Sequence, residues 1–203
     1  MSELPPGPTR FIVRQKLTLM VNRYEVIETD EAGTERGLLC FAEQKRMAFK
    51  EQVTFFSDAA RTEPVFGFKA RQVIDLGATY EITDAAGRSI GWFKKDFAAS
   101  LGRSTWRLGT PDGFTCVGQE RNAKVAVLRR VWDFLPVVGD LPVPWLFHFD
   151  FRAGDGTVVL SSTKRMGLKD TYFVELPTTN DGWRLDWRVA AAMAVALDAL
   201  QSR

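Results

Sequence analysis

The sequence predicts an all-β protein in which a closed antiparallel barrel of about twelve strands surrounds a hydrophobic C-terminal α-helix. Three observations indicate this fold class: an apolar run near the C-terminus, many short alternating segments, and repeated turn signals between them. The apolar run spans residues 189–197 and has no polar face. Because a helix that is apolar on all sides must be enclosed, and the rest of the chain is typical of strands, we expect the strands to enclose it.

The alternating segments recur along the chain at the regular spacing of a barrel or sandwich. An open sheet of this size would leave two exposed edges, whereas closure removes both edges and creates an interior for the helix. We therefore expect a closed barrel. The expected strands are residues 10–15, 17–21, 23–29, 37–44, 52–57, 64–70, 79–83, 88–94, 104–108, 114–120, 145–152, 157–162 and 171–176.

Several of these segments are joined by an aspartate followed by a glycine three positions later. Asp30 with Gly33 and Asp84 with Gly87 are the clearest cases. The Asp side chain can bond to its own backbone, and Gly can take the left-handed conformation that closes a hairpin. This turn chemistry predicts an antiparallel meander.

One segment, residues 122–134, has apolar residues at helical spacing and predicts a surface helix, which a Pro-rich loop or edge at 135–144 follows. The 203 residues, 45% of them hydrophobic, fit one large domain, which we place at 10–203. Residues 1–9 are expected to form a flexible N-terminal tail, because they lack the basic and apolar stretches of a secretory signal.

The charge balance is almost even. Lys and Arg number 27 and Asp and Glu number 25, giving a formal net charge of +2. This balance indicates no nucleic-acid partner. The apolar run is also shorter than the roughly 20 residues of a transmembrane helix, so no membrane span is expected. We expect a cytoplasmic protein, with peripheral membrane association as an open alternative.

Four segments together resemble the tubby C-terminal-like superfamily, in particular its LURP-one-related and phospholipid-scramblase-like branch. They are FIVRQK at 11–16, YEITDAAGRSIG at 80–91, DTYFV at 170–174 and WRLDWRVAAAMAVALD at 183–198. The resemblance covers roughly residues 10 to 200, and its main evidence is that the four segments occur in the same order as in the family. It implies a twelve-stranded barrel threaded by a hydrophobic helix, in agreement with the prediction from periodicity.

The resemblance also implies a functional neighbourhood. Tubby-like proteins bind phosphoinositides, scramblase relatives are associated with membranes and calcium, and plant LURP-one proteins are linked to defence. A fold alone does not transmit any of these functions. The chain lacks the long Pro-rich N-terminal region and the cysteine cluster of the scramblase pattern, which argues against lipid scrambling.

Four basic pairs are the candidate binding residues. In a barrel, some of them can converge on one rim and bind phosphate groups or anionic headgroups. The alternative is ordinary solvated surface charge, since acidic residues such as Glu43 and Asp170 lie close by in sequence. The pairs are Lys45 with Arg46, Lys94 with Lys95, Arg129 with Arg130, and Lys164 with Arg165.

The remaining reactive residues favour structural roles. Cys40 and Cys116 lie in strand-like contexts without partners at metal-ligand spacing, so buried free thiols are expected. His148 and Asp150 alternate with aromatic residues that should face the core. They would then share the other face, where cross-strand polar pairing is favoured over a catalytic or metal-binding role.

Asp198 has two alternative environments. It can be a buried acid with a shifted pKa, or it can lie at the helix exit, where it would reach water or pair with Arg184 or Arg188. A structural role is favoured in both cases.

The sequence carries no phosphate loop, nucleophile elbow, zinc-protease motif or calcium loop. We therefore expect a non-enzymatic binding module, without cofactor or metal, for an anionic phospholipid or a protein partner at the cytoplasmic membrane surface. One alternative is an enzyme or small-ligand carrier with a pocket at a barrel mouth, using His148, Asp150 and nearby arginines. The other is a purely structural scaffold.

Overall fold

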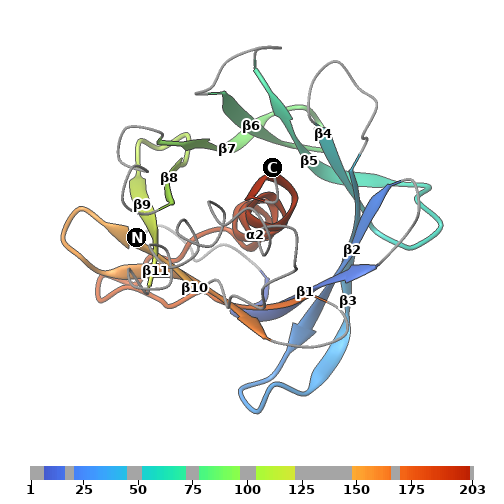
Figure 1. The fold of residues 1–203 in the computed structure, drawn as a ribbon, viewed down its shortest axis with the longest axis horizontal. Helices are drawn as coiled ribbons and strands as arrows, with labels where there is room; N and C mark the ends of the chain where they lie inside the picture. Colours follow the sequence, from blue (N-terminus) through green and yellow to red (C-terminus); the bar gives the residue numbers. More distant parts are fainter. Residues whose placement is uncertain are drawn as a thin grey trace, which may run out of the picture.

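The computed structural model describes residues 7–16, 21–44, 52–71, 78–96, 104–121, 148–165 and 170–201. Within these ranges, twelve strands close into one antiparallel barrel around a single helix, α2 (Trp187–Gln201). Figure 1 shows the ring of strands with α2 in its centre. The predicted fold class is confirmed.

The barrel is an antiparallel meander. Each strand pairs with the next strand in the chain, and β1 pairs with β12 to close the sheet. The strands are β1 (Arg10–Lys16), β2 (Asn22–Thr29), β3 (Glu35–Gln44), β4 (Gln52–Phe56), β5 (Pro64–Ala70), β6 (Thr79–Asp84), β7 (Ser89–Lys95), β8 (Thr105–Gly109), β9 (Thr115–Glu120), β10 (His148–Ala153), β11 (Val158–Arg165) and β12 (Thr171–Glu175).

Some predicted segments lie outside the described residues. They are residues 17–20 of the expected strand 17–21, the helix at 122–134, the Pro-rich stretch at 135–144, and residues 145–147 of the expected strand 145–152. Near the N-terminus, residues 7–9 contact the domain: Gly7 accepts a hydrogen bond from Arg184 at 3.2 Å, and Thr9 accepts one from Leu176 at 2.8 Å.

The predicted turn chemistry is present in the hairpins. The Gly33 amide donates to the Asp30 carbonyl at 3.0 Å, and Gly33 has a φ of 82°. Gly87 repeats this arrangement with Asp84 at 3.0 Å and a φ of 77°. A residue with a Cβ rarely adopts this backbone conformation, which explains the glycine at both positions.

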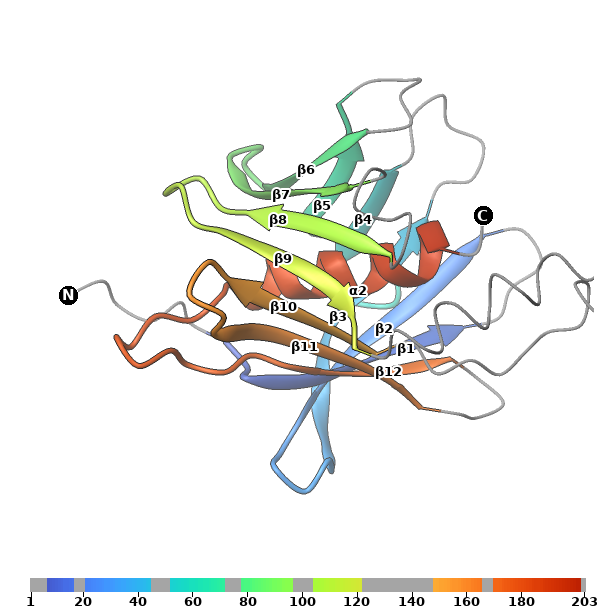
Figure 2. The same cartoon turned by 60° about the vertical axis from the view of Figure 1, so that its left-hand side comes forward.

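Helix α2 runs through the barrel, as Figure 2 shows from the side of the helix. Its residues from Val189 to Leu197 are at most 3% exposed. Asp186 caps the N-terminus, because its carboxylate accepts a hydrogen bond from the Arg188 amide at 2.9 Å. The helix presents mainly small alanines, and large aromatic rings on the strands, such as Phe68 and Phe93, fill the space around them.

Gly118 in β9 is required by a close approach inside the barrel. A Cβ at this position would lie 2.3 Å from Cε1 of Phe151. Phe151 is fully buried, so its ring has no free space to move into. Gly118→Ala is therefore expected to lower the free energy of unfolding by about 2 kcal/mol through overpacking, measured by urea denaturation.

Two controls separate overpacking from other effects of removing a glycine. Gly37→Ala is the matched control, because no atom lies within 4 Å of a Cβ there. In a Phe151→Leu background, the smaller side chain should accommodate the new methyl group and reduce the cost of Gly118→Ala. An equal cost in both backgrounds would show that Phe151 is not the cause.

The barrel has two chemically different mouths. Because successive strands are antiparallel, all odd-numbered strands end at the same mouth. We call it the loop mouth; the last residues of the odd-numbered strands there are Lys16, Gln44, Ala70, Lys95, Glu120 and Arg165. The opposite mouth carries the hairpin turns after the even-numbered strands, and we call it the turn mouth.

Candidate functional site

Two of the four candidate basic pairs are described, and both lie at the loop mouth. Lys94 and Lys95 end β7, and Lys164 and Arg165 end β11. In the ring, β8, β9 and β10 separate these two strands. At about 4.8 Å per strand, the two pairs are roughly 19 Å apart along the wall. They share one rim without forming a single cluster.

The other two pairs lie outside the described residues. In the chain, Lys45 and Arg46 directly follow Gln44, the last residue of β3, and Arg129 and Arg130 lie between β9 and β10. Both connections leave odd-numbered strands. The structure therefore places Lys94 with Lys95 and Lys164 with Arg165 at the loop mouth, and the other two pairs stay predictions.

One lysine of each described pair points into the mouth. Lys95 pairs with the buried Trp106 across the sheet, and its Nζ lies 5.8 Å from the Trp106 ring centroid. The Nζ of Lys164 lies 5.5 Å from the ring centroid of Tyr172 and forms a 2.8 Å ion pair with Asp170. These lysines are thus partly engaged in intramolecular contacts.

The other member of each pair follows the opposite face of its strand. Lys94 neighbours the inward-facing Phe93, so the strand alternation places Lys94 outward. Arg165 is exposed, and its guanidinium carbon lies 4.0 Å from the ring centroid of Phe173. Within the described part of the chain, neither cation forms an ion pair with a carboxylate. Both remain available to an anionic partner.

The turn mouth has the opposite character, because every turn there contains or adjoins an aspartate. Backbone amides hold these carboxylates; the hydrogen bond from the Arg88 amide is the main cause that lowers the pKa of Asp84. Backbone hydrogen bonds are also the main cause that lowers the pKa values of Asp30 and Asp155. The aspartates of the turn mouth are Asp30, Asp58, Asp84, Asp112, Asp155 and Asp181.

Asp198 lies at the C-terminal end of α2, inside the loop mouth. Tyr24 donates a hydrogen bond to its Oδ2 at 2.9 Å, and Tyr172 donates to its Oδ1. Burial raises the pKa of Asp198, and this effect outweighs the two hydrogen bonds. Of the two alternatives for Asp198, the acid with a shifted pKa agrees with this half-buried environment. The pairing with Arg184 or Arg188 is wrong, because those residues bind Gly7 and Asp186 near the helix N-terminus.

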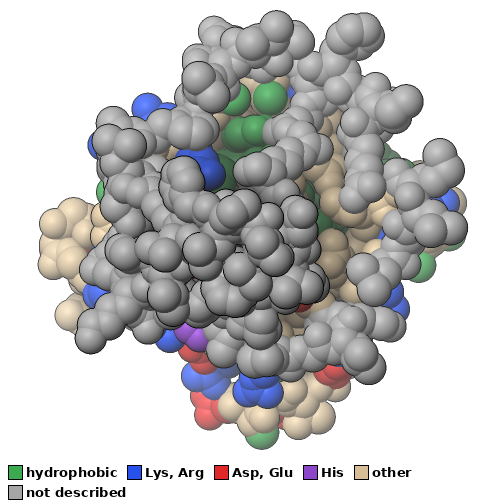
Figure 3. Space-filling model, in the orientation of Figure 1, with side chains coloured by type: hydrophobic (Ala, Val, Ile, Leu, Met, Phe, Trp, Pro, Cys, Tyr) green, Lys and Arg blue, Asp and Glu red, His purple; other side chains and the backbone are tan. Residues whose placement is uncertain are grey.

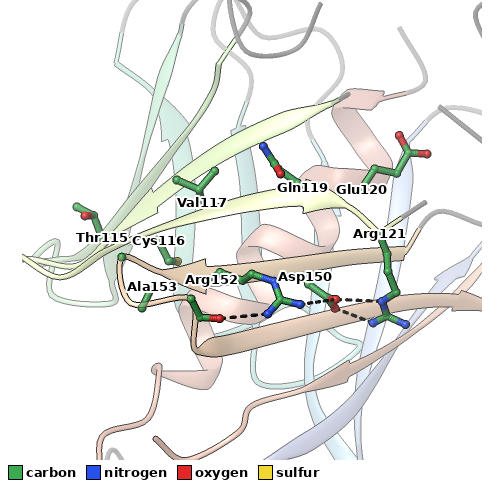
Figure 4. A pocket seen from close by; sticks show the side chains of 11 residues that line it. Thr115, Cys116, Val117, Gln119, Glu120, Arg121, Asp150, Arg152 and Ala153 are labelled. Carbon is green, nitrogen blue, oxygen red and sulfur yellow. Dashed lines mark hydrogen bonds and ion pairs between the residues drawn. The ribbon is translucent and has the colours of Figure 1, made fainter. Parts of the chain in front are cut away.

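A polar cluster on the outer wall joins β9, β10 and β11, and Figure 4 shows its members Arg121, Asp150 and Arg152. Arg121, directly after β9, donates from Nε and Nη2 to the two carboxylate oxygens of Asp150 at 3.0 and 2.6 Å. Ser161 donates to the same carboxylate at 3.0 Å, and Arg152 lies 3.6 Å from it. The predicted cross-strand polar pairing of Asp150 is confirmed.

This cluster borders a groove of about 540 Å³ on the wall between β9 and β10. Burial raises the pKa of Asp150, but the hydrogen bonds from Arg121 and Ser161 and the nearby Arg charges together lower it. Asp150 therefore stays ionised. The groove is lined by Thr115, Cys116, Val117, Gln119, Glu120, Arg121, Asp150, Arg152, Ala153, Gly154 and Gly156.

His148 shares the outer face with Asp150, as the alternation predicted, because Phe149 and Phe151 between and beyond them are buried. Burial and the Arg121 charge lower the pKa of His148. Among the described residues, its Nδ1 has no hydrogen-bond partner. The structure thus places His148 and Asp150 on the outer wall at the loop-mouth end of β10.

The cysteines are buried free thiols, as predicted. Cys40 and Cys116 are 0% and 2% exposed. Burial raises both pKa values, that of Cys116 to about 12. Neither thiol is therefore activated as a nucleophile at neutral pH.

Acidic side chains accompany the basic ones on much of the surface. On the face shown in Figure 3, Lys and Arg lie next to Asp and Glu along the lower edge, beside the single histidine. Within the described ranges, there is no group of three or more His, Cys, Asp or Glu side chains that could hold a metal ion. No helix in those ranges has the length and apolarity needed to cross a bilayer.

A closed antiparallel barrel of twelve strands around a hydrophobic C-terminal helix is the architecture of the tubby-like class that the sequence resembles. The family model described as LURP-one-related matches residues 39–198. This match covers most of the chain, so the chain belongs to the LURP-one-related family. A comparison with curated proteins found no match.

Proposed function

We propose that this domain is a non-enzymatic binding module that recognises anionic phospholipid headgroups at the cytoplasmic membrane surface through its loop mouth. The observation that supports the proposal is that both described basic pairs, Lys94 with Lys95 and Lys164 with Arg165, end strands at the loop mouth. Within the described residues, Lys94 and Arg165 form no ion pair there, whereas every turn at the opposite mouth has an aspartate.

The packing of the interior also favours recognition on the outside of the barrel. Helix α2 occupies the axis, and its residues from Val189 to Leu197 are buried against the strands. A bulky ligand inside would have to displace this packing. An anionic surface, by contrast, can approach the outward-pointing Lys94 and the exposed Arg165 without any rearrangement.

Binding to vesicles tests the proposal. Full-length protein is expected to co-sediment with vesicles of phosphatidylcholine and phosphatidylserine at low salt, and to dissociate as salt screens the charges. Each Lys or Arg near an anionic surface contributes about 1 kcal/mol. Neutralising two of them in Lys94→Gln/Arg165→Gln should therefore weaken binding by about thirtyfold.

The matched control removes the same charge at the turn mouth. Arg36→Gln/Arg88→Gln changes two side chains that are 65% and 80% exposed. This variant should bind the vesicles within about twofold of wild type, because its charges face away from the surface. No recruitment of the wild type, or equal weakening by both double variants, would refute lipid recognition at the loop mouth. A protein partner would then be the better explanation.

A further inference from the structure

On the accessible face of the groove between β9 and β10, two guanidinium groups meet one carboxylate, because Arg121 and Arg152 both approach Asp150. The next acidic side chain in the same cross-strand row, Glu175, forms its own ion pair with Arg10 at 3.1 Å. Glu120, the other acidic residue of the lining, is 1% exposed. The accessible face of the groove therefore carries more cationic than anionic groups.

The two arginines also retain donors. Arg121 uses Nε and Nη2 toward Asp150 and Ser161. Arg152 uses Nη1 toward the Gly156 carbonyl at 3.1 Å and Nη2 toward Asp150. Within the described part of the chain, Nη1 of Arg121 and Nε of Arg152 make no hydrogen bond. The side chains are 46% and 54% exposed, so these donors are accessible.

The β9 side of the groove supplies a different surface. Val117 is 39% exposed, one of the few large apolar side chains on the described surface. Figure 4 shows Val117 and Gln119 on β9 across from Arg152 and Asp150 on β10. A ligand that fits both sides combines one anionic group with a short apolar stem. The volume of about 540 Å³ lies in the usual range for small-ligand sites.

We infer that this groove, which runs along the outer wall from the loop-mouth end of β9, is a second binding site for a carboxylate attached to a short apolar stem. The carboxylate accepts hydrogen bonds from the remaining donors of Arg121 and Arg152, and the stem lies on Val117 beside Gln119. Asp150 keeps the two guanidinium groups in place through its hydrogen bonds with Arg121 and its ion pair with Arg152, so little ordering is required when the ligand binds. Either a free small acid or the C-terminal carboxylate of a peptide has this chemistry.

Titration of the 15N-labelled full-length protein with sodium hexanoate, followed by NMR, tests the site. Shifts are expected at the amides of Val117, Gln119 and Arg152. Hexan-1-ol, which has the same stem without the charge, should cause much weaker shifts. Scattered shifts, or equal binding of the alcohol, would overturn the inference.

Variants locate the carboxylate. Arg152→Gln should weaken hexanoate binding about tenfold, because a hydrogen bond to a charged group is lost. Arg88→Gln is the matched control, since it removes an equal charge from the β6–β7 turn and should leave binding unchanged. Val117→Ser, at an exposed position, tests the apolar side independently and should also weaken binding. Unchanged binding in both groove variants would refute the site.

A second arm distinguishes the two sources of the ligand. A short apolar peptide with a free C-terminus is compared with the same peptide amidated at that end. Tighter binding of the free peptide than of hexanoate assigns the site to peptide C-termini, and binding of hexanoate alone assigns it to a free acid. Binding of neither probe overturns the inference. Vesicle binding is measured separately, so failure at this groove leaves the loop mouth untouched.

Discussion

Ala192→Asp is expected to prevent the chain from folding at neutral pH. Ala192 lies in the middle of α2 and is fully buried. Burying its replacement as a neutral acid requires protonation, which costs about 4 kcal/mol at pH 7, since each pKa unit corresponds to about 1.4 kcal/mol. Overpacking adds roughly 1–3 kcal/mol. The sum approaches the whole stability of a typical domain, about 5–15 kcal/mol.

The measurement is circular dichroism after refolding from urea, together with the denaturation midpoint of any folded fraction. Ala32→Asp is the matched control, because Ala32 is exposed in the β2–β3 turn. The same substitution there should change stability by less than about 0.5 kcal/mol. If Ala192→Asp folded as well as this control, the helix would not be enclosed in solution, and the barrel assignment would be wrong.

The fold was predictable because its signals are local. The Asp and Gly pairs that close the hairpins lie three residues apart, and the apolar run of α2 is continuous. The first residue of the helix was harder to predict from the sequence. It begins at Trp187, before the apolar run, because Asp186 caps it. The polar Arg188 in the first turn interrupts the apolar pattern, although the Asp cap was a usable signal.

The candidate sites depend on contacts between distant residues, which a sequence pattern does not specify. Alternation with Phe149 and Phe151 placed Asp150 on the outer face, but its partner Arg121 lies 29 residues earlier. Their meeting depends on the register between β9 and β10, across a long connection. For the same reason, the sequence did not predict that the Tyr24 hydroxyl donates to Asp198, which lies 174 residues away. The basic pairs were visible as residues, but the common mouth of the two described pairs follows only from the closed antiparallel barrel.

Asp198→Ala is expected to lower the free energy of unfolding by about 3 kcal/mol. The substitution removes the acceptor that the hydroxyls of Tyr24 and Tyr172 share, and losing a hydrogen-bond partner in a buried site costs about 1–3 kcal/mol. Tyr24→Phe removes one of these donors. In the Asp198→Ala background, Tyr24→Phe should therefore cost less than in wild type, which a double-mutant cycle measures. Additive costs would show that the hydrogen bond does not contribute to stability.

Asp198→Asn separates the charge of this residue from its shape. Burial raises the pKa of Asp198 in the folded protein, whereas in the unfolded chain the pKa returns to about 3.9. Between the two pKa values, the folded state holds a proton that the unfolded state has lost, so this residue's contribution to stability falls as the pH rises. Asn has no such proton. The unfolding free energy of wild type minus that of Asp198→Asn should thus be larger at acidic than at neutral pH.

Urea denaturation at both pH values measures this difference, and the comparison between the two proteins removes the titration of all unchanged groups. Lys164 and Asp170 also act on Asp198, with opposite effects on its pKa. Lys164→Gln should strengthen the pH dependence, because it removes the positive charge that favours the ionised carboxylate. A wild type that gained stability over Asp198→Asn with rising pH would mean that the carboxylate is stabilised in its charged form, and that its hydrogen bonds to the two tyrosines outweigh burial.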